Sequence, residues 1–249
     1  MQRLENPTAD LVTGARLRAS INLGNAVLAR QDAPGALPYG VSVDIARAMA
    51  EKLGVAIEFV VCNSAGQSVD AVSRGVADVG FFAIDPHRGE SVLFSDAYLE
   101  IEGWYAVSRD SPIRSVEEVD SVGVSVAVSR ASAYDLYLSR ELKNAEIIRA
   151  PNPQAVAPQF ITQNIDVMAG VRQQLEADMR HYPGLRLLPE RFMVIRQAMG
   201  LARSRSGAAH AYLAAFVEEL KAGNFIAQAL ARHGIEGASL VSASGSAPR

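Results

Sequence analysis

The sequence contains a single cysteine, Cys62, so the chain cannot form a disulfide with itself. Cys62 ends the apolar stretch AIEFVVC, which is typical of a strand, and we expect a small core residue here rather than a reactive thiol. Histidine is also scarce: the chain has 4, and no two of them have the spacing of metal ligands. We therefore expect neither a bound metal nor a cofactor.

An excess of charge and long hydrophobic runs are missing too. The formal net charge is −3 at pH 7, which gives no basic surface for nucleic acid or anionic membranes. The apolar runs are far shorter than the roughly 18 residues of a membrane span, so we expect no membrane insertion. The first residues, MQRLENPTADL, lack the features of a secretory signal. The chain is then either a mature form whose signal has been removed or a cytoplasmic protein.

Strand and helix patterns alternate along most of the chain. The stretch SVDIARAMAEKLG predicts an amphipathic helix, with Ile45, Met49 and Leu53 on one face and Gly54 placed to end it. Nearly continuous apolar strands such as ADVGFFAI, alternating with helices, indicate an α/β fold whose parallel or mixed sheet is covered on both faces. The order strand, helix, strand, helix, strand occurs twice, and two further helices follow.

This repeated order predicts two α/β lobes. The chain is expected to cross from the first lobe to the second at EGWYAV and to return at RQAMGLA. The first lobe then comprises residues 1–102 and 200–249, and the second lobe residues 103–199.

Three segments in sequence order carry a more specific signal: YGVSVDIARAMAEKLG, SRGVADVGFFAIDPHR and VLFSDAYLEIEGWYAV. With them the chain resembles the extracellular solute-binding proteins of family 3, the amino-acid type of periplasmic binding protein with the type II fold, from about Arg16 to Gly234. The resemblance implies mixed sheets flanked by helices in two lobes, two hinge strands, and a small ligand held in the cleft between the lobes. It also implies a transporter permease as partner and, for a mature form whose signal has been removed, a periplasmic location. We expect a monomer, because such a receptor must open and close.

Arg88 is the main candidate for ligand binding. In the family, the turn after this strand places an arginine where it takes the ligand carboxylate, and the planar, permanently charged guanidinium suits that task. The alternative is that Arg88 pairs with Asp85, Glu90 or Asp96 and only holds the turn.

Four other positions of the first lobe correspond to family ligand contacts. Where the family usually has an acidic residue and a stacking aromatic, this chain has Asn22 and Asn25. Their amides can donate and accept hydrogen bonds, or they can form a turn stabilised by its own backbone. The family positions for a backbone carbonyl and a hydroxyl fall on Phe81 and Ala83, and Ala83 has no hydroxyl to offer.

In the second lobe, the segment VSRASAY matches the family's turn at a helix N-terminus, where free N–H groups and the helix dipole favour an anion. Ser132 keeps the hydroxyl of that turn and is available as the N-cap of the predicted helix SAYDLYLSREL. Arg130 adds a cation, unless its side chain is simply solvated.

Val171 is the largest departure from the family. Amino-acid binders commonly carry an acidic residue there, which holds the ligand ammonium. An ammonium buried beside valine would lose several kcal/mol of hydration unless Glu102 or another carboxylate replaced that charge. Because Arg88, Arg130 and Arg172 are all candidate cations, we expect an anionic, carboxylate-bearing ligand, such as an organic acid or a modified amino acid.

The alternative is an enzyme on the same scaffold, such as a cyclohexadienyl-type dehydratase. Candidate acid–base groups are few: His87 lies beside the inferred cleft, and Glu100 and Glu102 lie near the hinge. We favour the interpretation that both glutamates are solvated charges at a strand edge or form a hinge salt bridge. We therefore expect a binding protein without catalytic residues.

Overall fold

The computed structural model describes residues 10–12 and 14–243 of the chain. These residues form two compact units. Unit 1 takes the described residues up to Glu100 and from Arg196 onward, and unit 2 comprises Ile101–Ile195.

Two long strands connect the units. The strands β5 (Leu99–Ser108) and β9 (Leu185–Ala202) each contribute residues to both units. The boundaries expected from the sequence were after residues 102 and 199 instead. The EGWYAV and RQAMGLA segments lie within these two strands, the first inside unit 2 and the second inside unit 1.

Unit 1 contains a mixed sheet. Its strands are β1 (Arg16–Asn22), β2 (Ala56–Cys62), β3 (Val79–Ala83), β4 (Val92–Phe94), the C-terminal part of β9, and β10 (Ser239–Leu240). β1 lies between β2 and β3 and is parallel to both, whereas β9 runs antiparallel to β3 and β4. β10 runs antiparallel to the first residues of β5. All five residues of β3 are buried, as the apolar run ADVGFFAI predicts.

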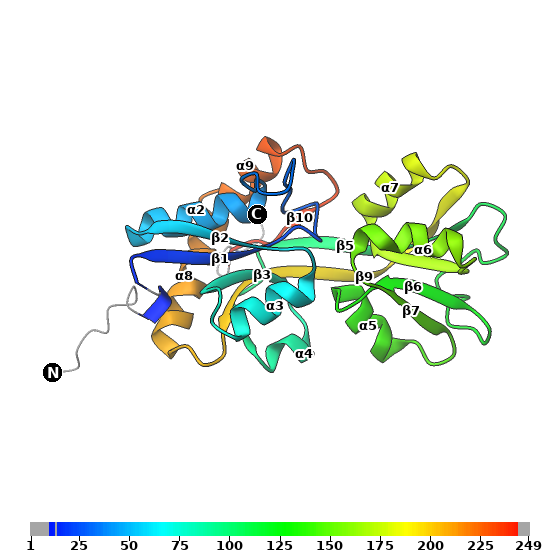
Figure 1. The fold of residues 1–249 in the computed structure, drawn as a ribbon, viewed down its shortest axis with the longest axis horizontal. Helices are drawn as coiled ribbons and strands as arrows, with labels where there is room; N and C mark the ends of the chain where they lie inside the picture. The colour runs from blue at the N-terminus through cyan, green and yellow to red at the C-terminus, as the bar shows by residue number, and fades with distance from the viewer. Residues whose placement is uncertain (1–9, 13, 244–249) are drawn as a thin grey trace. The chain divides into compact units, whose positions relative to one another are not determined.

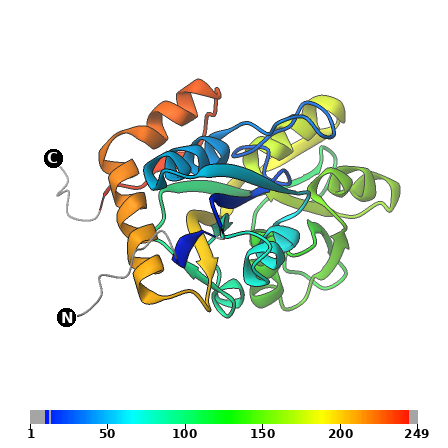
Figure 2. The same ribbon diagram turned by 60° about the vertical axis from the view of Figure 1, so that its left-hand side comes forward.

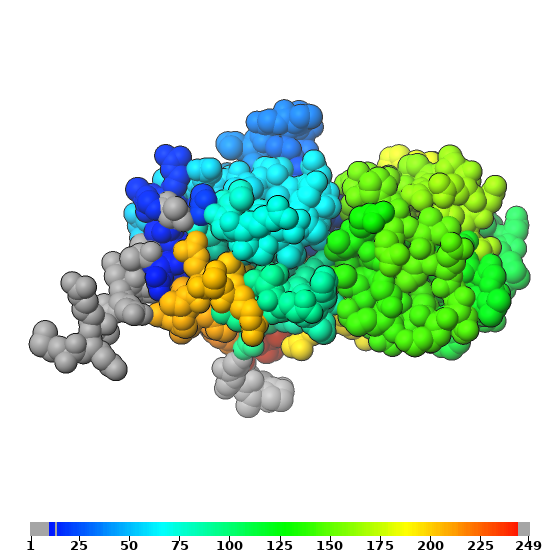
Figure 3. Space-filling view, turned by 60° about the horizontal axis from the view of Figure 1, so that its bottom comes forward, coloured from blue at the N-terminus to red at the C-terminus, as the bar shows by residue number. Residues whose placement is uncertain are grey.

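The helices of unit 1 cover both faces of this sheet. They are α2 (Val41–Leu53), α3 (Ala65–Ser73), α4 (Pro86–Gly89), α8 (Gly207–Ala222) and α9 (Phe225–Arg232). α2 and α9 pack on one side and α3 on the other (Figure 1; Figure 2 shows the same layers from another direction). α8, orange in Figure 3, forms part of the outer surface of the unit.

The predicted helix SVDIARAMAEKLG is confirmed as α2. Ile45 and Met49 are fully buried against the sheet, and Gly54 ends the helix with a φ of 67°. That conformation suits glycine, which has no Cβ to clash with the backbone. The helix therefore begins and ends where its apolar spacing and its glycine indicate.

A buried ion-pair cluster fastens three parts of unit 1 together. The Asp78 carboxylate, at 0% side-chain exposure, accepts from Arg18 on β1 at 2.8 Å and from Arg205, just before α8, at 2.7 Å. Arg205 also donates to the backbone carbonyl of Asp10. Two guanidinium groups thus compensate one buried carboxylate.

Unit 2 has a sheet in the order β9-β5-β8-β6-β7. Besides parts of β5 and β9, its strands are β6 (Ser125–Ser129), β7 (Glu146–Ala150) and β8 (Val167–Val171). β6 is parallel to β7 and β8, and β8 is antiparallel to β5. The helical elements are α5 (Ala133–Glu141), the 3-10 helix η1 (Pro153–Ala155), α6 (Val156–Thr162) and α7 (Arg172–His181).

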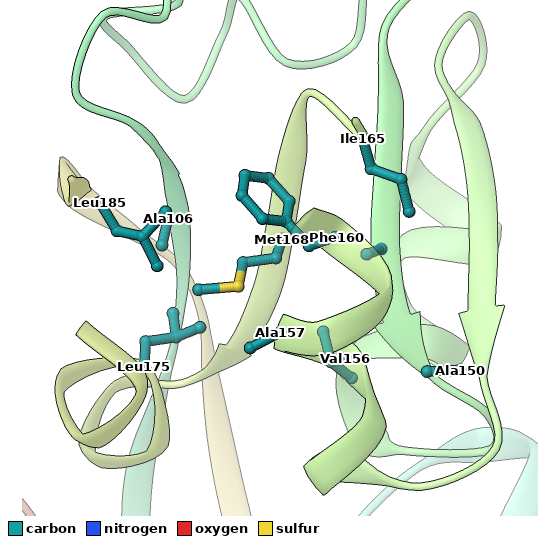
Figure 4. Packing of buried hydrophobic residues seen from close by; sticks show 10 residues of the cluster. Ala106, Ala150, Val156, Ala157, Phe160, Ile165, Met168, Leu175 and Leu185 are labelled. Carbon is teal, nitrogen blue, oxygen red and sulfur yellow. The ribbon is translucent and has the colours of Figure 1, made fainter. Parts of the chain in front are cut away.

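The core of unit 2 forms around Met168 of β8. Figure 4 shows its side chain extending toward Leu175 of α7, with the Phe160 ring of α6 beside it. Ala106 of β5 and Leu185 of β9 belong to the same cluster. Both crossing strands are therefore anchored in this core, which fixes their positions within unit 2.

Candidate functional site

The unit 1 candidates gather at the ends of β1 and β3. Since these two strands are parallel neighbours, their C-terminal ends lie at one edge of the sheet. Asn22 ends β1, and Phe81 and Ala83 belong to β3. The short helix α4 follows β3 and carries Arg88.

Asp85 positions this helix. Its Oδ1 accepts a hydrogen bond from the backbone N–H of His87 at 2.9 Å and of Arg88 at 3.4 Å, which is the contact of a helix N-cap. Pro86 occupies the first helical position, where its missing N–H costs no hydrogen bond. The Asp-Pro pair thus turns the chain and brings Arg88 back toward β3.

Arg88 is a buried cation, with 4% of the residue exposed. Its Nη1 donates to the backbone carbonyl of Ala83 at 3.2 Å. Burial lowers the pKa of the guanidinium to about 10, against the opposing attraction of Asp85. At that pKa the group is still charged at neutral pH. A charged guanidinium held out of water is suited to binding an anion.

The two asparagines differ in how their side chains are used. Asn22 Oδ1 accepts from the backbone N–H of Gly24 at 2.9 Å, so this amide stabilises its own turn. Asn25 Oδ1 is buried and has no hydrogen-bond partner among the described residues. Because buried acceptors are almost always bonded, this oxygen calls for a donor that the described chain does not supply.

The two remaining candidates of unit 1, Phe81 and Ala83, have buried side chains. Phe81 and Ala83 are each 5% exposed. The neighbouring Phe82 points to the opposite face, into the core cluster with Val72 and Val92. The contribution of Ala83 that the structure defines is the carbonyl that accepts from Arg88.

In unit 2, the turn before α5 is stabilised by a carboxylate of the chain itself, that of Asp135. Ser132 is buried, and its Oγ caps α5 by accepting from the backbone N–H of Asp135 at 3.0 Å. The Asp135 carboxylate accepts from the N–H of Ala131 at 2.8 Å and from Arg149 Nε at 2.9 Å. The Asp135 carboxylate thus already occupies part of the anion site expected at the N-terminus of α5. The Arg130 side chain is exposed.

Val171 ends β8 beside β5, where it pairs with Gly103, the residue after Glu102. It precedes α7 and gives that helix no side-chain cap. Glu102 is the carboxylate that was expected from the sequence to replace the missing acidic residue, but its two oxygens are already engaged. Oε1 accepts from Arg191 Nη1 at 2.6 Å, and Oε2 accepts from Trp104 Nε1 at 2.9 Å.

Arg172 completes this charged cluster. Its Nη1 lies 3.9 Å from Glu102 Oε2, its Nε donates to Glu176 at 2.8 Å, and its guanidinium carbon lies 4.8 Å from the centre of the Trp104 ring. The last contact has the geometry of a cation–π interaction. Arg172 was a candidate cation from the sequence, but Arg191 was missed. Arg191 lies 89 positions from its partner Glu102.

The cluster sets the ionisation of Glu102. Burial opposes the charged form, but the hydrogen bonds from Arg191 and Trp104 and the charges of the two arginines outweigh it, so the pKa of Glu102 is lowered. The sequence left Glu102 as an acid–base group, a solvated charge or a member of a hinge salt bridge. Its contacts with Arg191 and Arg172 are those of a salt bridge. A carboxylate with a lowered pKa is a poor general acid at neutral pH.

Two kinds of feature are not found in the part of the chain that the structure describes. No group of three or more His, Cys, Asp or Glu side chains is arranged to hold a metal ion. None of the described helices combines the length and apolar character needed to cross a bilayer.

Residues 28–234 match the family model of the bacterial extracellular solute-binding proteins, family 3. This chain belongs to that family. The match covers the candidate residues of both units except Asn22 and Asn25, which precede it. No curated protein matches the sequence of this chain.

Solved structures show the family's two-lobed α/β fold. A mutant of ArgBP from T. maritima superposes with a TM-score of 0.76 at 18% identity, covering 91% of this chain and 98% of the other. A putative ABC-transporter binding component from Wolinella succinogenes, complexed with lysine, gives 0.75 at 17%, covering 88% and 96%. AncCDT-1, an ancestral amino acid-binding protein and precursor of cyclohexadienyl dehydratase, gives 0.73 at 19%, covering 89% and 96%.

The resemblance inferred from the sequence is therefore confirmed, as is the two-lobed periplasmic-binding-protein fold. At 17–19% identity these neighbours establish the fold of this family member and not its ligand. The ligand has to be argued from the residues of this chain.

Proposed function

We propose that the chain is the solute-binding receptor of an ABC transporter, and that it closes its two units over a small carboxylate-bearing ligand. The observation that carries the proposal is Arg88, a charged side chain with 4% of its residue exposed, which follows the C-terminal end of β3. In this proposal the guanidinium makes two parallel hydrogen bonds to the ligand carboxylate.

The free energy of burying Arg88 supports this role. Desolvation has already lowered the pKa of the guanidinium, so the charge is less stable in the folded chain than in water. A ligand carboxylate would restore the interactions that water supplied in the unfolded chain. Truncating one member of such a desolvated pair costs about 2–5 kcal/mol of binding.

The ligand class follows from the positive charges and from the missing anion. Val171 brings no carboxylate, and Glu102 is ion-paired with Arg191 and accepts a hydrogen bond from Trp104. A ligand ammonium near these residues would find no free negative partner among them. We therefore propose an organic acid or a modified amino acid whose amino group is absent or blocked.

A dehydratase is the second candidate, favoured by one observation. The chain superposes on AncCDT-1, a precursor of cyclohexadienyl dehydratase. The ionised state of Glu102 argues against it, because a dehydratase needs a proton donor for the leaving hydroxyl. Incubation with hydroxylated cyclohexadiene acids, followed by aromatic absorbance, tests the enzyme directly. If the native chain turns over such a compound and Glu102→Gln does not, the dehydratase would replace the receptor as the proposed function.

We place the receptor in the periplasm, as a monomer that presents its ligand to a membrane permease. The family is described as extracellular, which supports this compartment over the cytoplasmic alternative. Light scattering coupled to size-exclusion chromatography, with and without ligand, tests the monomer. A dimer in both conditions would contradict it.

The ligand itself can be identified experimentally. A native mass spectrum of gently purified protein should show a bound mass that unfolding releases. Calorimetric titration should then give tight binding for carboxylic acids without a free ammonium and weak binding for ordinary zwitterionic amino acids. Tight binding of zwitterionic amino acids alone would reject the proposed ligand class, while the receptor function would stand.

A further inference from the structure

The short strand β10 pairs with β5 immediately before the boundary between the units. Ser239 lies opposite Glu100 and Leu240 opposite Leu99, and the next residue, Val241, donates its N–H to the carbonyl of Tyr98 at 3.3 Å. Unit 2 begins at Ile101. β10 therefore holds the last residues that β5 contributes to unit 1.

On the other side of the boundary, β5 pairs with β8 from Gly103 onward. Between the β10 pairing and the β8 pairing, only Ile101 and Glu102 lie outside both registers, and β9 is the other hydrogen-bonded neighbour of β5. The place where β10 pairs with β5 thus determines the length of β5 that lies between its pairing with β10 and its pairing with β8. Strand residues held by fewer hydrogen bonds bend at lower cost.

The attachment of β10 is weak enough to be reversible. Both of its residues are exposed, so its pairing buries little apolar surface. The segment that leads to it from α9 contains Gly234 with a φ of 61° and Gly237 with a φ of 70°. Such glycines give the chain the backbone freedom to swing away from β5.

From this placement we propose that β10 is a detachable strap on the crossing strand β5, and that its attachment slows the bending by which the two units open and close. When the strap is paired, it adds to the restraint that β9 places on β5, and the most easily bent part of β5 is confined to the residues next to Ile101. When it detaches, that part extends back toward Tyr98. The effect on ligand exchange rests on the proposed function, whereas the effect on β5 does not.

A proline substitution tests the strap without truncating the chain. Val241→Pro removes the N–H that donates to Tyr98, and Val241→Ala keeps it. Loss of one hydrogen bond should raise the opening equilibrium about fivefold. In the ligand-free protein, amide hydrogen exchange of Leu99–Glu102 should therefore accelerate about fivefold in Val241→Pro and stay unchanged in Val241→Ala. Equal exchange in both variants would overturn the proposal.

A pair of truncations provides the second measurement. A chain ending at Gly237 lacks the strap, and a chain ending at Ala243 keeps all its described residues. We expect the first to exchange the Leu99–Glu102 amides at least as fast as Val241→Pro, and to release a bound carboxylate ligand several times faster than the second. Unchanged exchange at Leu99–Glu102 would overturn the strap. Faster exchange with equal release rates would overturn its control of ligand exchange. If no carboxylate binds to either chain, the proposed ligand fails while the exchange measurement still decides whether β10 restrains β5.

Discussion

The guanidinium of Arg88 donates to the backbone carbonyl of Ala83 at 3.2 Å, and this contact orients a cation that the fold has taken out of water. The carbonyl belongs to the end of β3, so the strand itself aims the side chain. Ala83, which has no hydroxyl to offer, thus contributes its backbone carbonyl. The arrangement holds a charged guanidinium out of water beside the end of β3.

The first prediction is that removing this charge stabilises the unliganded protein. Arg88→Met keeps much of the side-chain volume and abolishes the desolvation cost, so we expect the midpoint of thermal unfolding to rise by about 2 °C or more. The control is Arg74→Met, an exposed arginine of unit 1, which should leave the midpoint unchanged. A lower midpoint in Arg88→Met would show that its chain contacts outweigh its burial.

The two asparagines should separate stability from ligand binding. Asn22→Ala removes the acceptor of its own turn and should lower the free energy of unfolding by about 1 kcal/mol. Asn25→Ala removes an acceptor that has no partner among the described residues, so it should leave stability unchanged or raise it. If a ligand donor reaches Asn25, its substitution weakens binding about tenfold while Asn22→Ala does not. Chemical denaturation and calorimetry measure the two effects, and the reverse pattern would contradict this assignment.

Asp78 is predicted to be the most important ionised side chain for the stability of unit 1. Asp78→Asn leaves Arg18 and Arg205 without their buried counter-charge and should cost about 3–5 kcal/mol in urea denaturation. Glu58→Gln breaks a pair with Arg16 in which both side chains are exposed, and should cost less than about 1 kcal/mol. Similar losses in the two variants would contradict the compensation described for Asp78.

Glu102 should make stability depend on pH in the acid range. Because its folded pKa is lowered below the ordinary value of 4.5, its contribution is fully present above pH 4.5 and is lost as the pH falls through the folded pKa. The stability difference between the native chain and Glu102→Gln should therefore be constant at neutral pH and vanish in acid. Chemical denaturation at a series of pH values measures this difference. A constant difference down to the lowest pH at which the protein folds would contradict the lowered pKa.

Trp104, the single tryptophan of the chain, reports the same titration because its Nε1 donates to Glu102. Its fluorescence should change over the acid range in the native chain and lose that change in Glu102→Gln. The control Glu100→Gln, at a glutamate without a contact to Trp104 in the described structure, should titrate as the native chain does. An unchanged titration in Glu102→Gln would assign the signal to another group.

Local patterns were sufficient to predict the elements that form through local interactions. The apolar spacing of Ile45 and Met49 and the glycine at position 54 gave α2, and the continuous apolar run gave β3. Ser132 was predicted as the cap of α5 because its hydroxyl and the following helical pattern are adjacent in sequence. In each case the interacting groups are a few residues apart.

What the sequence did not reveal depends on residues far apart along the chain. β10 has two residues, too few for any periodicity, and is defined only by its pairing with β5. Arg191 lies 89 positions from Glu102 and becomes its partner because β5 and β9 lie side by side. The Asp135 carboxylate at the Ala131 N–H was also missed, although their spacing of four residues is a local signal that could have been used.

The most direct test of the account is the affinity of Arg88→Met for the carboxylate ligand recovered from the native protein, measured by calorimetry beside Arg74→Met. If Arg88 holds the ligand carboxylate, Arg88→Met should bind at least about thirtyfold more weakly, while Arg74→Met binds as the native chain does. Equal affinity in the two variants would contradict the central role assigned to Arg88.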